Sequence, residues 1–299
     1  EFLLNKFRNL IKESDLEIHY NLSTQSSPGK TEDFNSTNTP RKFWFEPRNF
    51  DDLPEIKKLF SNDTSLGVGY APYSKLEKLV LDIEKTLNSE SFKKDHPWIG
   101  SDIKIMGTRH GQQFGVTLCI PQIANYVHSV DEYRQNLEQA KQVIFKISQN
   151  IGINNLELSC NTRDNLETKE LYLTAIGSSI ESGDEGLVGR GNRVNGIISP
   201  TRLMSMEGAC GKNPVYHIGK IYYVAAHEIS KKIFEKFGIA NEVSLISQSG
   251  RNLLDPWKTF VTLYNSDISE EQVRIFVENE LKNIPEITRN LLEHKLRLF

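Results

Sequence analysis

The sequence predicts a mixed α/β (α+β) protein in which several small sheets are covered by helices. Apolar residues recur at helical spacing from Lys75 to Leu87. From Phe114 to Ile120 they alternate with other residues, which is typical of a half-buried strand. A third run, from His217 to Phe237, is helical again, and Gly238 follows it as a C-cap residue. Helices and strands therefore follow one another along most of the chain.

The N-terminal part is expected to be less regular. A short helix is predicted from Phe2 to Lys12 and a strand from Leu16 to Tyr20. The polar stretch from Ser23 to Thr39 can bury little apolar surface, so a loop is predicted there.

The remaining elements are predicted from local patterns. A helix with Asp131 as N-cap runs to Ile147, and strands cover Leu156 to Cys160 and begin at Leu171. Further strands include Val243 and Leu245, and Phe260 to Tyr264. Ser269 and Gln272 form a capping-box pattern before a helix, and Pro285 interrupts the chain ahead of a final helix.

Composition narrows the class of protein. The 299 residues include 36 Lys and Arg against 39 Asp and Glu, and this net charge of −3 indicates neither a nucleic-acid nor a membrane partner. No apolar run approaches the roughly 20 residues that span a bilayer. Three scattered cysteines do not suggest a disulfide framework. A cytoplasmic protein with reduced thiols is expected.

Two segments hold charged residues beside glycines or within apolar strands. Asp63 precedes the stretch Gly67-Val68-Gly69, and capping of a turn would explain this aspartate without any ligand. Lys104 lies between two isoleucines, where the simplest interpretation is the solvent-facing residue of an edge strand. A phosphate contact is the functional alternative for Lys104.

The third segment gives the strongest signal. Residues 183–196 and 208–214 gather Asp184, Arg190, Arg193 and Lys212 among glycines. Glycines let backbone N–H groups approach an anion, arginine and lysine bind phosphate, and carboxylates hold Mg²⁺ together with phosphate oxygens. A metal–polyphosphate site is therefore predicted.

Two familiar phosphate motifs are excluded. Met206 stands where a P-loop needs its first glycine, and Asn213 stands where it needs Ser or Thr. Val194 takes the place of the third glycine of a dinucleotide fingerprint. Neither a P-loop NTPase nor a Rossmann dehydrogenase is supported.

Together these segments resemble the archaeal-type S-adenosylmethionine synthetases. The matching stretches are NDTS-GVGYAP at 62–72, DIK-MG at 102–107, GD-G-VGRGNRVNG at 183–196, MSME at 204–207, GKNPV-H-GK at 211–220 and SQ-G at 247–250. Their collinear order extends the resemblance over nearly the whole chain.

The resemblance implies three similar α/β domains about a pseudo-threefold axis, with the first domain incomplete. We expect a partial domain at 1–72, a central domain at 73–165 and a C-terminal domain at 166–299. It also implies a homodimer, or a tetramer of two dimers, in which sheets pack together and active sites lie between subunits.

The implied reaction joins methionine to ATP. The methionine sulfur attacks C5′ and expels triphosphate, which is then cleaved to pyrophosphate and phosphate, with Mg²⁺ and K⁺ assisting. By resemblance, Lys104, Arg190 and Lys212 clamp the phosphates, Asp184 acts near the metal or nucleotide, and Asp63 lies near the methionine ammonium. The set of weaker candidates for this pocket is Arg193, Asn195 and Asn213.

One departure leaves alternatives open. The family's Gly-His-Pro-Asp motif, whose histidine helps the leaving group and whose aspartate binds Mg²⁺, does not occur in this sequence. The chain is the ordered part of a longer synthetase, a short regulatory homologue that pairs with a catalytic subunit, or a divergent nucleotide-binding homologue.

Overall fold

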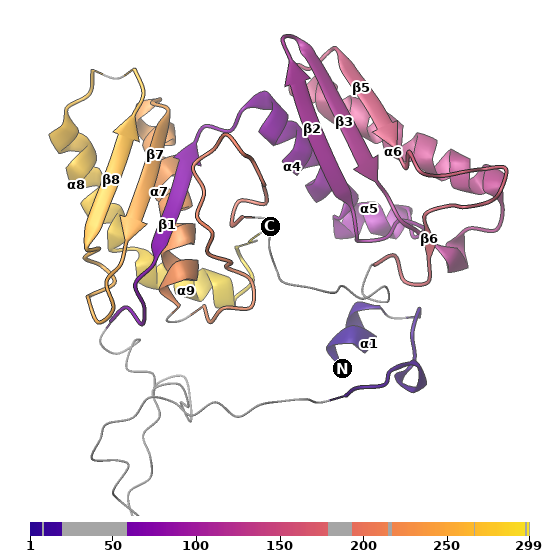
Figure 1. The fold of residues 1–299 in the computed structure, drawn as a ribbon, viewed down its shortest axis with the longest axis horizontal. Helices are drawn as coiled ribbons and strands as arrows, with labels where there is room; N and C mark the ends of the chain where they lie inside the picture. The colour runs from indigo at the N-terminus through magenta and orange to yellow at the C-terminus, as the bar shows by residue number, and fades with distance from the viewer. Residues whose placement is uncertain are drawn as a thin grey trace, which may run out of the picture. The chain divides into compact units, whose positions relative to one another are not determined.

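The computed structural model describes residues 1–7, 9–19, 59–178, 193–214, 217–265, 267–296 and 298. The chain divides into two compact units (Figure 1). The first unit comprises residues 1–20 and 73–187, and the second comprises residues 21–72 and 188–299. The division into three domains stays a prediction.

The first unit has a three-stranded mixed sheet with helices on it. Its elements are α1 (Phe2–Lys6), a 3-10 turn (Glu13–Asp15), α4 (Lys75–Leu87), α5 (Glu90–Asp95), β2 (Lys104–His110), β3 (Gln113–Cys119), β4 (Gln122–Ile123), a second 3-10 turn (Ala124–Tyr126), α6 (Val130–Asn150), β5 (Leu156–Cys160) and β6 (Leu173–Thr174). The strand order is β2-β3-β5, antiparallel between β2 and β3 and parallel between β3 and β5.

The core of the first unit lies between this sheet and helices α4 and α6. The alternating residues of β3 are buried on one face, as the sequence pattern predicts. Leu79 and Ile83 of α4 and Ile144 of α6 are fully buried in the same cluster. A separate short parallel pair joins β4 and β6.

The second unit is built around one long helix. Its elements are β1 (Leu66–Ala71), α7 (Ile218–Phe237), β7 (Asn241–Ile246), β8 (Lys258–Leu263), α8 (Glu270–Leu281) and α9 (Ile284–Leu292). The strands form an antiparallel sheet in the order β1-β7-β8 (Figure 1). Helix α7 contacts β1 and β7 as well as α8 and α9. It is therefore surrounded by apolar partners and forms the centre of this unit's core.

Two glycines in β1 allow α7 to approach the strand. A Cβ added at Gly67 would lie 2.1 Å from the carbonyl carbon of Tyr222, and one added at Gly69 would lie 2.3 Å from that of Ala226. Any side chain at either position would collide with the helix backbone. The Gly-Val-Gly stretch is therefore explained by helix–strand packing, with Val68 buried between them.

Most of the predicted elements are present, with local corrections near the ends. Helix α1 ends at Lys6, and residues 16–19 form no strand. Ser129, two residues before the expected Asp131, is the N-cap of α6, and its hydroxyl accepts the N–H of Glu132 at 3.0 Å. Gly238 ends α7 in the left-handed conformation, as predicted.

Two C-terminal predictions also need correction. Ser269 is the N-cap of α8, but its side chain makes no capping hydrogen bond. Pro285 does not interrupt a helix: it lies in the first turn of α9, where its missing N–H costs nothing. The predicted loop at 23–39 lies outside the described residues.

Candidate functional site

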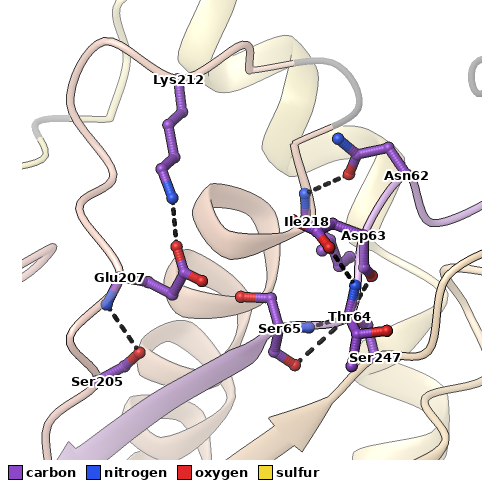
Figure 2. Close-up of polar contacts among 9 residues, drawn as sticks. All are labelled: Asn62, Asp63, Thr64, Ser65, Ser205, Glu207, Lys212, Ile218 and Ser247. Atoms are coloured by element: carbon purple, nitrogen blue, oxygen red, sulfur yellow. Dashed lines mark hydrogen bonds and ion pairs between the residues drawn. The ribbon is translucent and has the colours of Figure 1, made fainter. Parts of the chain in front are cut away.

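The candidate site lies at the N-terminal end of α7, where three segments of the second unit meet (Figure 2). The segments are the residues leading into β1, the loop from 205 to 214, and Ser247 after β7. His217 occupies the N-cap position of α7 but makes no side-chain capping bond. Instead the Asn62 side-chain oxygen accepts the N–H of Ile218 at 3.1 Å, so a distant segment caps the helix.

Ser247 fixes the segment that carries Asp63. Its hydroxyl accepts the N–H of Ser65 at 2.8 Å and donates to the carbonyl of Asp63 at 2.8 Å. The Asp63 carboxylate itself is exposed and accepts the N–H of Thr64 at 2.7 Å. Asp63 therefore presents a carboxylate to solvent on an anchored backbone, which suits a contact with a cationic group.

Lys212 and Glu207 form an ion pair beside the helix end (Figure 2). Their side chains are 28% and 30% exposed. The hydrogen bond from the Lys212 ammonium lowers the pKa of the Glu207 carboxyl, so Glu207 is ionised at neutral pH. This carboxylate lies against the first turn of α7, since a Cβ at Gly219 would be 2.9 Å from its Oε2 atom. An anion is stabilised there by the helix dipole.

Two further residues complete the helix end. The buried Lys220 ammonium donates to the backbone carbonyl of Lys212, and burial lowers the pKa of Lys220. Burial also lowers the pKa of His217, and the nearby Lys212 lowers it further. The buried Nδ1 of His217 has no hydrogen-bond partner among the described residues. The predicted Asn213 accepts the N–H of His217 through its carbonyl at 3.2 Å.

Arg193 and Asn195, predicted for the same pocket, lie at a second place in this unit. They border a small pocket whose lining includes Tyr70 of β1 and Tyr223 of α7. The Asn195 amide donates to the Tyr70 hydroxyl at 2.9 Å.

The remaining predicted site residues are Lys104, Asp184 and Arg190. Lys104 is exposed at the start of the edge strand β2 in the first unit, which agrees with the solvent-facing interpretation. Asp184 and Arg190 lie outside the described residues. Their roles stay predictions.

A metal site made by protein side chains alone is not present in the described part of the chain. No group of three or more His, Cys, Asp or Glu gathers there. Mg²⁺ bound to phosphates needs only one or two carboxylates, with water completing its shell. The exposed Asp63 fits such a role chemically, and so does the predicted Asp184.

Several residues of this site were not selected from the sequence. They are Ser65, Glu207, His217, Lys220 and Ser247. Each lies within or directly beside a stretch that carries the resemblance, such as MSME or GKNPV-H-GK. The available signal was their position in these stretches, because residue type alone does not distinguish them from solvated polar residues.

Fold and site together define a class: a mixed α/β protein with a lysine-bearing loop over a helix N-terminus, an arrangement suited to anions. The sequence matches the family model of S-adenosylmethionine synthetase (AdoMet synthetase) over residues 49–295. The chain belongs to this family.

Individual relatives support the assignment. The chain is 38% identical to a probable S-adenosylmethionine synthase of Aquifex aeolicus over 79% of its own length and 60% of the relative. It is 35% identical to the S-adenosylmethionine synthase of Pyrococcus furiosus over 99% of its length and 72% of the relative. It is 40% identical to the S-adenosylmethionine synthase of Thermoplasma acidophilum over 83% of its own length and 65% of the relative. These matches confirm the archaeal type.

A solved structure of an unusual S-adenosylmethionine synthetase from Campylobacter jejuni is also similar, with a TM-score of 0.49 and 14% identity over 76% of this chain and 60% of that one. The family assignment rests on the sequence matches. The chain spans about 60% of the length of most of these relatives. No described helix is long and apolar enough to cross a membrane.

Proposed function

We propose that the chain serves methionine adenosyltransferase activity, forming S-adenosylmethionine from ATP and methionine and cleaving the triphosphate to pyrophosphate and phosphate. The observation that supports this most is the meeting of Asp63, Lys212 and the α7 N-terminus at one place in a member of this family. Cation, carboxylate and helix dipole are the groups that a polyphosphate and an amino acid require.

The proposed chemistry needs charge stabilisation more than proton transfer. A thioether is a neutral nucleophile, so no general base is required for its attack. Negative charge grows on the departing triphosphate, and fixed cations with backbone N–H groups stabilise it without reorganisation. Lys212 and the first turn of α7 would hold one part of the triphosphate. Asp63 would hold the methionine ammonium group.

The ion pair between Glu207 and Lys212 adds a detail to this proposal. The Glu207 carboxylate neutralises Lys212 and lies at the positive end of the helix dipole. A phosphate group bound there would compete with Glu207 for the same ammonium. Lys220, which binds the Lys212 carbonyl, would keep the lysine backbone in place during this exchange.

The remaining assignments are proposals of the same kind. Lys104 and Arg190 would complete the phosphate clamp, and Asp184 would hold Mg²⁺. A bound divalent ion would neutralise phosphate charge, and we expect Mg²⁺ and K⁺ to be required. We also propose a cytoplasmic homodimer with active sites between subunits, or a tetramer of such dimers.

A second candidate function is that of a regulatory homologue, which would retain the family fold and pair with a catalytic synthetase. Co-purification with a larger homologous chain, and no product from this chain alone, would favour it.

The proposal is tested by measuring S-adenosylmethionine formed from ATP and methionine with Mg²⁺ and K⁺ present. The chain is assayed alone and within any longer natural protein that contains it. Lys212→Ala should reduce kcat/KM by about 100-fold or more, because one fixed cation at the leaving group is lost.

The matched control is Lys146→Ala, which removes an exposed lysine on α6. It should leave the rate unchanged. Absence of product from every natural form of a folded protein would overturn the proposal.

A further inference from the structure

The second pocket of this unit carries positive charge and lacks any carboxylate in its lining. The lining includes Arg193, Arg202, Tyr70, Tyr223 and His227, together with neutral side chains. Its cavity volume is about 10 Å³, which is room for one water-sized group. The space therefore suits a single oxygen atom of a larger ligand, because whole ligands occupy pockets of roughly 300 Å³ or more.

The backbone that carries Arg193 is held in one conformation. Residues 193–196 form a turn in which the N–H of Gly196 donates to the carbonyl of Arg193 at 2.8 Å. Gly196 has a φ of 82°, a left-handed conformation that glycine adopts without strain. Val194 is buried, and the Asn195 amide donates to the Tyr70 hydroxyl. The turn is therefore anchored to β1.

Not every hydrogen-bond donor of the Arg193 guanidinium has a partner among the described residues. Its Nε atom is buried and has no hydrogen-bond partner among the described residues. A buried donor without a partner costs free energy, and a bound acceptor would recover it. Arg193 also forms no ion pair within the described part of the chain, so no described carboxylate neutralises its charge.

The other walls would strengthen an anion contact. The Arg202 guanidinium lies 4.5 Å from the centre of the Tyr70 ring and donates to the carbonyl of Pro72 at 3.3 Å, so a second positive charge is fixed nearby. The His227 ring packs 5.5 Å from Tyr70 and 5.6 Å from Tyr223. Aromatic walls exclude water, and electrostatic attraction is stronger where water is excluded.

The pocket is close enough to the α7 N-terminus to serve the same substrates. Tyr223 and His227 lie four and eight residues beyond Gly219 on the helix, which is roughly 6 and 12 Å along its axis. One ligand, or two reacting ligands, could contact both places.

We propose that Arg193 and Arg202 form an oxyanion subsite that binds either the carboxylate of the amino-acid substrate or a phosphate group of the nucleotide. Arg193 supplies the bidentate contact, and Arg202 supplies a second charge. The inference rests on the proposed function for the identity of the ligand, but its test does not depend on turnover.

The test measures binding of two separate probes to the 299-residue chain by calorimetry: methionine alone and inorganic tripolyphosphate alone. Arg193→Gln should weaken the binding of one probe by about 10- to 100-fold, because a charge-assisted bidentate contact is lost. A loss confined to methionine assigns the carboxylate, and a loss confined to tripolyphosphate assigns the phosphate.

The control is Arg274→Gln, which makes the same charge change on the exposed face of α8. If wild type binds neither probe, or if Arg193→Gln matches this control for both, the subsite is overturned. Should Arg193→Gln not fold, Arg193→Lys replaces it: a smaller selective loss supports the subsite and unchanged affinities overturn it. If Arg193→Gln loses affinity for one probe and the protein shows no synthetase activity, the subsite is supported and the proposed function is contradicted.

Discussion

Each of the two units buries a group of polar side chains. Only in the first unit does every polar atom of this group have a hydrogen-bond partner within the group or its backbone neighbours. In the first unit, Asn161 accepts the N–H of Ile120 at 2.7 Å and donates to the Ile120 carbonyl and the Tyr133 hydroxyl. Tyr133 in turn donates to Asp164 at 2.5 Å, and burial with this carboxylate raises its pKa. None of these atoms lacks a partner.

The second unit differs, because some buried polar atoms at the α7 N-terminus and in the pocket lined by Arg193 (the Arg193 pocket) have no partner in the part of the chain that the structure describes. There Arg193 Nε and His217 Nδ1 are buried without partners among the described residues. A closed polar network rigidifies a core, whereas an open one costs free energy that a ligand can recover. The first network therefore has a structural role, and the unpartnered donor of Arg193 supports the binding role proposed above for the second.

The largest expected effect comes from opening the closed network. Asn161→Ala leaves the buried N–H and carbonyl of Ile120 without their side-chain partner, so the free energy of unfolding should fall by about 3 kcal/mol. Urea unfolding measures this loss, with Asn154→Ala as the exposed control. Methionine and tripolyphosphate affinities should not change. A selective loss of either affinity like that of Arg193→Gln would remove the distinction between the networks.

A pH measurement probes the wall of the Arg193 pocket. Burial lowers the pKa of His227 from 6.5 to about 4, so the unfolded state takes up a proton at pH 5 that the folded state does not. Stability should therefore fall as pH decreases from 6.5 towards 4. Between pH 7.5 and 5 the wild type should lose about 2 kcal/mol more than His227→Gln.

Urea unfolding midpoints of wild type and His227→Gln, measured at pH 7.5 and pH 5, test the predicted loss of stability. His110→Gln, an exposed histidine on β2, is the control and should retain the wild-type dependence. An unchanged dependence in His227→Gln would show that the pocket wall accepts a proton while folded, contrary to a dry aromatic site.

The smallest expected effect concerns the ion pair at the α7 N-terminus. Glu207→Gln removes the carboxylate that competes for Lys212, so tripolyphosphate should bind several-fold more tightly. The pair is partly exposed, and its loss should change the free energy of unfolding by about 1 kcal/mol or less. Calorimetry measures the affinity. Glu286→Gln, which breaks an exposed pair on α9, is the control. Weaker binding in Glu207→Gln would show that the carboxylate assists the ligand.

The sequence by itself determined the elements whose signals are local. Helix α7 with its terminal Gly238, the alternating strand β3 and the amphipathic α4 follow from spacing of apolar residues within one turn or one pleat. The family also followed from the sequence, because several motifs occur in collinear order, and the match over residues 49–295 confirms it.

Only the tertiary structure decided how distant residues combine. Ser65 meets Ser247 across 182 positions, and Asn62 caps a helix 156 positions away. No local period encodes such contacts, since they arise when β1 packs along α7. The same packing explains Gly67 and Gly69, which in the sequence could equally belong to a turn or a ligand contact. Likewise, the unmet donor of Arg193 exists only because folding buries it, so its role could not be derived from residue type.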